Sequence, residues 1–219
     1  MMLKVFIILL SCICVSCGLQ EDLSSNYVKR DFNGISLNIP NQYVLPDLPS
    51  SITGTSGDLG IGMEASLKIP LSDISFHVNR DKGLSGNVVV FLMPLSQGDV
   101  QISKDAQNAW DGVGLYDNRI IKYDNFANLY RVYPKSGYPK LWNYFKSKPD
   151  GNILDPESVV ASCMVGPLDQ EAADLSNVMC KTISTYKSIK IELNYSGEYI
   201  LELHSLTLKL KTQLTKWED

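Results

Sequence analysis

The amino-acid sequence predicts an α+β protein, with a mainly antiparallel β-sheet covered by an amphipathic helix at the C-terminus. From residue 31 onward, short segments alternate apolar and polar residues, which is the pattern of strands with one buried face. The connections between these segments are short and mostly not helical, so antiparallel pairing is favoured. From Gly197 the apolar residues recur every three or four positions, which is typical of a helix.

Residues 1–16 have the pattern of an export signal. Lys4 precedes an apolar run from Val5 to Leu10, and small residues then lead to Cys17. The run is too short to span a bilayer. We therefore expect a signal peptide that is removed on export.

The residues around the expected cleavage site resemble the lipobox of bacterial lipoproteins, in which small residues precede an acylated Cys. Val15 and Ser16 fit that pattern, whereas Cys14 stands where Leu is preferred. This resemblance implies lipidation of Cys17. A cut before Cys12 and an ordinary secretory cleavage, directly after Ser16 or two residues later, remain as alternatives.

A lipidated Cys17 would tether the protein to a membrane without a spanning segment, because several acyl chains give stable anchoring. Gly18, in place of Asp, is similar to the outer-membrane sorting signal of Gram-negative lipoproteins and slightly favours the outer membrane, facing the periplasm. In a Gram-positive cell the same signal would leave the protein on the outer face of the only membrane. We expect residues 17–30 to be a lipidated, polar tether and residues 31–219 to be a single domain.

Charge excludes some partner classes. Without residues 1–16 the chain carries five more acidic than basic residues, which argues against nucleic acid or an anionic lipid surface as a partner. A basic partner or a merely soluble surface fits the acidity better.

The strand candidates share period-two patterning. They are Ile35–Ile39, Glu64–Ile69, Ile74–Asn79, Asn87–Met93, Asn118–Tyr123, Leu129–Tyr133, Trp142–Lys146, Val159–Val165, Val178–Tyr186 and Ile189–Asn194. The Gly-, Ser- and Thr-rich stretch Ser50–Gly62 predicts a loop. Short helices are predicted at Lys104–Trp110 and Leu168–Leu175.

The C-terminal helix is expected to cover one face of the sheet. Its apolar positions are Tyr199, Leu203, Leu206, Leu210, Leu214 and Trp217. A helix that lies on a membrane or binds a partner is the alternative.

Cys163 and Cys180 are the two cysteines left after the signal and the proposed lipid site. In an oxidising compartment such a pair predicts a disulfide, which closes a loop of about eighteen residues and stabilises the fold by roughly 3 kcal/mol. A redox pair would usually have C-x-x-C spacing, and a zinc site needs three or four ligands, whereas His77 and His204 lie far away in the sequence.

The sequence carries no recognised catalytic signature. G-x-S-x-G, H-E-x-x-H and the P-loop pattern are absent from the sequence, and Gly57, Gly60 and Gly62 lack the order of a dinucleotide fingerprint. Ser184 and Lys187 form an S-x-x-K in a strand pattern, not at a helix start. We therefore expect no enzyme, no cofactor and no metal.

Aromatic residues concentrate between Tyr123 and Phe145. Such residues suit both strand packing and exposed recognition surfaces, so the segment fits a sheet core or a surface that binds protein or glycan. We expect Tyr133, Tyr138 and Trp142 to bind the partner, with Tyr138 and Trp142 reaching solvent.

The C-terminal third resembles the ends of periplasmic lipoproteins encoded beside type VI secretion effectors, the immunity proteins that neutralise phospholipase toxins. The resemblance rests on the Cys pair, the strand Ser188–Tyr195 and the terminal helix, and Phe32–Pro40 is similar in style to the first strand of that family. It implies a small α+β periplasmic domain that binds a toxin and blocks its active site. It transfers no functional residue to this chain.

The expected function is therefore that of a lipid-anchored envelope binding protein, most simply an immunity protein that binds and neutralises a delivered toxin. A structural or assembly lipoprotein of the cell envelope is the alternative from another class. An enzyme with an unrecognised site is the third.

Overall fold

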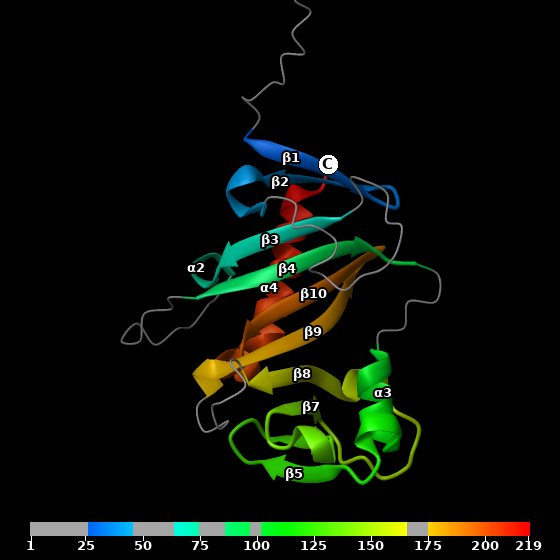
Figure 1. Ribbon diagram of the computed structural model, residues 1–219. Coiled ribbons are helices and arrows are strands. Elements are labelled where there is room, and N and C mark those ends of the chain that lie inside the picture. The colour runs from blue at the N-terminus through cyan, green and yellow to red at the C-terminus, as the bar shows by residue number, and fades with distance from the viewer. Residues whose placement is uncertain (1–25, 46–63, 75–85, 97–101, 166–174) are drawn as a thin grey trace, which may run out of the picture.

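The computed structural model describes residues 26–45, 64–74, 86–96, 102–165 and 175–219 (Figure 1). Its strands are β1 (Tyr27–Phe32), β2 (Ile35–Pro40), β3 (Ala65–Pro70), β4 (Asn87–Pro94), β5 (Ile120–Asp124), β6 (Leu129–Tyr133), β7 (Leu141–Phe145), β8 (Val159–Val165), β9 (Val178–Tyr186) and β10 (Ile189–Ser196). Its helices are α2 (Leu71–Ile74), α3 (Lys104–Asp111) and α4 (Leu203–Trp217), with short 3-10 turns that include η2 (Gly114–Tyr116), η3 (Lys135–Gly137) and η6 (Gly197–Glu202).

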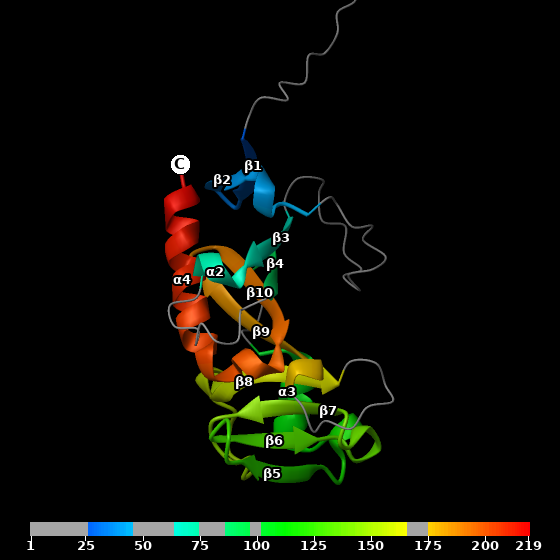
Figure 2. The same ribbon diagram turned by 90° about the vertical axis from the view of Figure 1, so that its left-hand side faces the viewer.

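The strands form two antiparallel sheets, which confirms the predicted α+β class. In the described part of the chain, the large sheet has the order β3-β4-β10-β9-β8-β7-β6-β5, and β1 pairs with β2 in a separate hairpin. Figure 2 shows α4 along one side of β3, β4 and β10, and α3 behind β7 and β8. The predicted strands Leu129–Tyr133, Val159–Val165 and Val178–Tyr186 have the same bounds in the structure.

The structure differs from the sequence predictions near the N-terminus. Tyr27–Phe32 form β1, so the last part of the expected tether is a strand. The turn between β1 and β2 is Asn33-Gly34, and both residues have positive φ (52° and 85°), as a tight hairpin turn requires. Ile74 ends α2 and does not begin a strand.

Several predictions lie outside the described residues. These are the signal peptide, the lipid site at Cys17, the loop Ser50–Gly62, His77, and most of the helix predicted at Leu168–Leu175. They stay predictions.

Helix α4 packs its apolar stripe against the large sheet, as predicted. Leu206, Leu210 and Leu214 are buried and belong to the same hydrophobic cluster as Leu193 of β10 and Val90 of β4. The end of α4 is tied to the first hairpin, because Lys29 donates to the Asp219 carboxylate at 2.5 Å and the Asp219 amide donates to the Ser36 carbonyl at 3.2 Å. The helix therefore joins the hairpin to the sheet.

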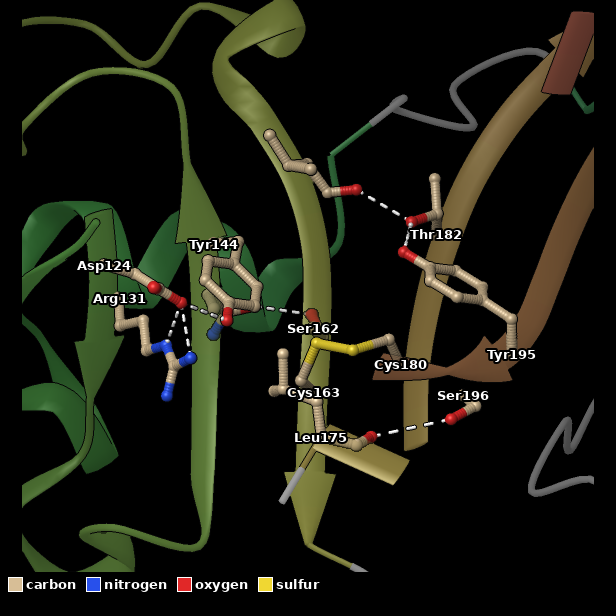
Figure 3. The surroundings of a disulfide bond; sticks show 12 residues. Asp124, Arg131, Tyr144, Ser162, Cys163, Leu175, Cys180, Thr182, Tyr195 and Ser196 are labelled. Carbon is tan, nitrogen blue, oxygen red and sulfur yellow. Dashed lines mark hydrogen bonds and ion pairs between the residues drawn. A yellow bond between two sulfur atoms is a disulfide. The ribbon is translucent and has the colours of Figure 1, made fainter. Parts of the chain in front are cut away.

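The predicted disulfide is present and joins β8 to β9 in the middle of the large sheet. Cys163 of β8 and Cys180 of β9 are directly opposite, with Cα atoms 4.1 Å apart (Figure 3). Strands β8 and β9 pair over only four positions, from Ser162–Lys181 to Val165–Val178, whereas β9 and β10 pair over eight. A register shift between β7 and β8 leaves Val160 as an extra residue, and such a bulge bends a strand. The disulfide thus joins the two halves of the sheet.

The packing of α4 predicts a contrast between two leucines in the same helix. Leu210→Ala is expected to lower the free energy of unfolding by about 3 kcal/mol, because its side chain is fully buried and the change leaves a cavity. Leu208→Ala is the matched control: that side chain is 52% exposed, so a change within about 0.5 kcal/mol is expected. Urea denaturation measures both, and equal losses would contradict the packing described here.

Candidate functional site

The aromatic segment divides between core and surface. Tyr133, Trp142, Tyr144 and Phe145 are buried, and Tyr130 is half-buried. Tyr123, Phe126 and Tyr138 are exposed, by 48%, 58% and 41%. The structure thus confirms that Tyr138 reaches solvent. The same expectation for Trp142 is wrong, because its side chain is 0% exposed. It lies directly opposite Cys163 of β8, and both side chains belong to the main hydrophobic cluster.

An ion pair between Asp124 of β5 and Arg131 of β6 lies within this aromatic segment. The Arg131 guanidinium donates through Nε at 2.7 Å and through Nη2 to Asp124 Oδ2, and the Tyr144 hydroxyl donates to the same oxygen at 2.7 Å. The other carboxylate oxygen accepts from the backbone N–H groups of Phe126 (3.0 Å) and Ala127 (3.3 Å). One oxygen of Asp124 therefore holds the β5–β6 turn, and the other connects Arg131 of β6 with Tyr144 of β7 (Figure 3).

The electrostatics keep this network charged. Burial would raise the pKa of Asp124, but the hydrogen bonds from Tyr144 and Arg131 and the guanidinium charge outweigh it, so the pKa lies below its ordinary value. Burial and the neighbouring carboxylate raise the pKa of Tyr144, so its hydroxyl stays protonated and continues to donate.

Tyr138 is connected to this network through Tyr133, whose hydroxyl accepts from Arg131. Its ring meets the edge of Tyr133 with centroids 5.1 Å apart, and Tyr133 in turn contacts Trp142 at 5.7 Å. Lys122 of β5 donates to the Tyr138 hydroxyl and lies 4.6 Å from its ring centroid. The Arg131 guanidinium lies 5.0 Å from the Trp142 ring centroid, so this row of aromatic rings ends beside a positive charge that Asp124 holds in place. We call Lys122, Tyr133 and Tyr138 the tyrosine patch.

A second polar cluster supports the opposite face of β7. The Asn143 side chain is buried and donates to Asp105 of α3 at 2.9 Å and to the Tyr116 hydroxyl at 2.6 Å. The Ser162 hydroxyl of β8 donates to Oδ1 of the Asn143 side chain. This cluster anchors α3 behind the strands that carry the tyrosine patch, so both faces of β7 are held in place.

The remaining sequence candidates do not gather into a site. In the S-x-x-K sequence, Ser184 lies in β9 and Lys187 lies in the turn between β9 and β10, so no helix joins them. Lys187 forms an ion pair with Glu218 at 2.5 Å. His204 is exposed on α4. Within the described ranges, no group of three or more His, Cys, Asp and Glu residues could hold a metal, and no helix there is long and apolar enough to cross a bilayer.

Comparisons of the chain with protein-family models, curated proteins and solved structures found no match.

The Asp124 network predicts a specific acid sensitivity. A carboxyl whose pKa is lower in the folded state contributes stability above its unfolded pKa, near 4, and this contribution is lost as the pH falls through the folded pKa. Asp124→Asn should destabilise the protein by about 3 kcal/mol at pH 7, because it leaves Arg131 unpaired, and should flatten the loss of stability below pH ~4.

Urea titrations from pH 7 to pH 3 measure this effect. The exposed turn residue Asp117 provides the matched control, since Asp117→Asn makes the same change in charge and is expected to alter stability by less than ~0.5 kcal/mol. An Asp124→Asn protein with the stability and pH profile of the Asp117 variant would show that the ion pair contributes nothing.

Proposed function

We propose that this chain is a lipid-anchored envelope binding protein that holds a protein partner with the tyrosine patch, and that the partner is a delivered toxin which it neutralises. The observation that carries the proposal is the tyrosine patch itself, an exposed ring fixed by a lysine and by buried aromatic neighbours. Tyrosine offers a large, rigid contact with a polar tip, and its side chain loses little entropy on binding.

The position of the patch in the fold supports this proposal. Figure 1 shows β1 at one end of the molecule and β5 at the other, with the C-terminus near β1. The proposed lipid site at Cys17 precedes Tyr27, the first residue of β1, by only ten positions. An acyl anchor would therefore hold the β1 end at the membrane and turn the tyrosine patch toward the compartment from which a partner arrives.

The fixed geometry of the patch also favours binding. The Tyr133 hydroxyl accepts from Arg131 at 3.4 Å and the Tyr133 ring contacts Tyr138, while the disulfide and the Asn143 cluster hold the neighbouring strands. A preorganised surface loses less conformational entropy when it binds a partner than a loop that must first become ordered.

The partner class comes from the sequence resemblance to immunity lipoproteins. The resemblance implies a protein that binds a toxin and blocks its active site. The binding surface then needs fixed contact groups and no chemistry of its own, which suits a patch whose neighbouring carboxylate, Asp124, is committed to structural hydrogen bonds.

An affinity experiment with two tyrosine variants tests the proposal. The unlipidated mature chain, Gly18–Asp219 with its disulfide formed, is used to capture proteins from the producing cell's secreted and envelope fractions, which are identified by mass spectrometry. The recovered effector is then assayed with and without the chain. We expect a toxin in stoichiometric amount whose activity the chain abolishes.

Tyr138→Ala should weaken that complex at least ~20-fold, as loss of a central aromatic contact does. Tyr27→Ala is the matched control, because Tyr27 is a comparably exposed tyrosine (53%) at the opposite end of the fold. Its variant should bind like the unmodified chain. Recovery of envelope assembly proteins alone, while effectors are expressed, would contradict the toxin assignment and favour a structural lipoprotein.

A further inference from the structure

The geometry points to the outer edge of β5 as a docking site for an extended, acidic segment of the protein partner, which adds to the large sheet as a further antiparallel or parallel strand. This inference rests on the proposed function, because it specifies how the same end of the molecule holds its partner. Strand β5 is the last strand of the sheet (Figure 2).

The Cα distance between Cys163 and Cys180 shows toward which neighbouring strand the backbone N–H and C=O groups of each residue point. In an antiparallel pair, directly opposite residues that exchange hydrogen bonds have Cα atoms about 5.5 Å apart, and those that do not are about 4.5 Å apart. The Cα atoms of Cys163 and Cys180 are 4.1 Å apart. The backbone N–H and C=O of Cys163 therefore point away from β9, toward β7.

The alternation then passes from strand to strand. Cys163 is opposite Trp142, so the backbone N–H and C=O of Trp142 form hydrogen bonds with β8. Those of the next residue, Asn143, point to the other side and form hydrogen bonds with β6. The Val165 amide donates to the Lys140 carbonyl at 2.9 Å, as this alternation requires for the residues two positions away from Cys163 and Trp142.

The same reasoning reaches the edge of the sheet. Asn143 is opposite Val132, so the backbone groups of Val132 form hydrogen bonds with β7 and those of Arg131 form hydrogen bonds with β5. Arg131 is opposite Lys122, so the backbone groups of Lys122 face β6. Those of Ile121 and Tyr123 must then point outward.

These outward groups form a template for another strand. Among the described residues, no hydrogen bond reaches the backbone of Ile121 or Tyr123 from outside the sheet. Unpaired N–H and C=O groups in a row on an edge strand are what an extended peptide pairs with in strand addition.

The charge around β5 selects the partner segment. Residues 117–148, which contain β5, β6 and β7, carry seven Lys or Arg residues and two Asp, a net charge of +5 in a chain whose net charge is −4. The ion pair between Asp124 and Arg131 removes one charge of each sign and leaves this balance unchanged, and Lys122 is the basic residue within β5 itself. Lys122 and Tyr138 flank the edge on one face of the sheet, and Tyr123 and Tyr130 flank it on the other, with ring centroids 5.0 Å apart. Acidic side chains that alternate along an added strand would meet this positive charge.

Amide hydrogen exchange with synthetic peptides tests the inference. The probes are a blocked peptide of alternating Thr and Glu residues and the same peptide with Lys in place of Glu, added to the unlipidated mature chain and followed by NMR. We expect the acidic peptide to bind at least ~10-fold more tightly, with a strong salt dependence. It should slow exchange at the amides of Ile121 and Tyr123 and leave Lys122, already bonded to β6, unchanged.

Two variants of one residue separate backbone from side-chain binding. Tyr123→Ala removes the ring and keeps the N–H, whereas Tyr123→Pro also removes the outward N–H, and proline is tolerated on an edge strand where its nitrogen faces solvent. We expect the proline variant to bind the acidic peptide about tenfold more weakly than the alanine variant. Circular dichroism confirms that both variants are folded.

Other outcomes overturn the inference. Equal binding by the two Tyr123 variants, unchanged exchange at Ile121 and Tyr123, or failure of the acidic peptide to bind would each exclude strand addition. The proposed function would survive these results if Tyr138→Ala still releases the captured toxin. If the peptide adds to β5 while the capture experiment yields no toxin, the proposed function fails and the docking edge stands.

Discussion

The Cys163–Cys180 bond secures a short pairing in the middle of the large sheet, and the position of the tyrosine patch depends on it. Strands β5 to β8 are linked to β9 through four paired positions, and beyond them the bulge at Val160 directs β8 away. There the Thr182 hydroxyl donates to the Val160 carbonyl at 2.8 Å and contacts the Tyr195 hydroxyl at 3.0 Å (Figure 3). A side chain thus replaces a missing backbone bond, and the covalent bond prevents the gap from widening.

This arrangement gives the two ends of the protein different roles. At one end α4, the first hairpin and β3, β4 and β10 form a continuous core, where a sheet face and a helix stripe bury each other. At the other end, both faces of β7 are held by polar networks around Asp124 and Asn143, and the aromatic rings above them are left partly exposed. Rigid support below and exposed rings above suit recognition of another protein.

Periodicity was sufficient to predict most of the sheet, because one buried face imposes alternation on each strand. It also predicted α4 from its apolar spacing, and export together with an even cysteine pair predicted the disulfide. Strand β1 was missed because Tyr27–Phe32 contains charged residues, although Asn33-Gly34 is a hairpin signal that identifies the strand before it.

The candidate site was harder to predict. Trp142 and Tyr138 have similar propensities, but Trp142 lies on a buried face of β7, whereas Tyr138 follows η3 in the connection before β7 and is exposed. The Asp124–Arg131 pair leaves little signal in the sequence, since seven positions separate the two residues and only the β5–β6 hairpin brings them together. Its one trace is the four-residue turn after Asp124, a residue that commonly accepts hydrogen bonds from the next turn's amides.

The most direct test of the account is amide hydrogen exchange on the double variant Cys163→Ala, Cys180→Ala. If the disulfide holds the far half of the sheet in place, amides in β6, β7 and β8 should exchange at least ~10-fold faster than in the unmodified protein, while those in β4 and β10 change little. Unchanged exchange in β6 to β8, or equal acceleration in both halves, would contradict it.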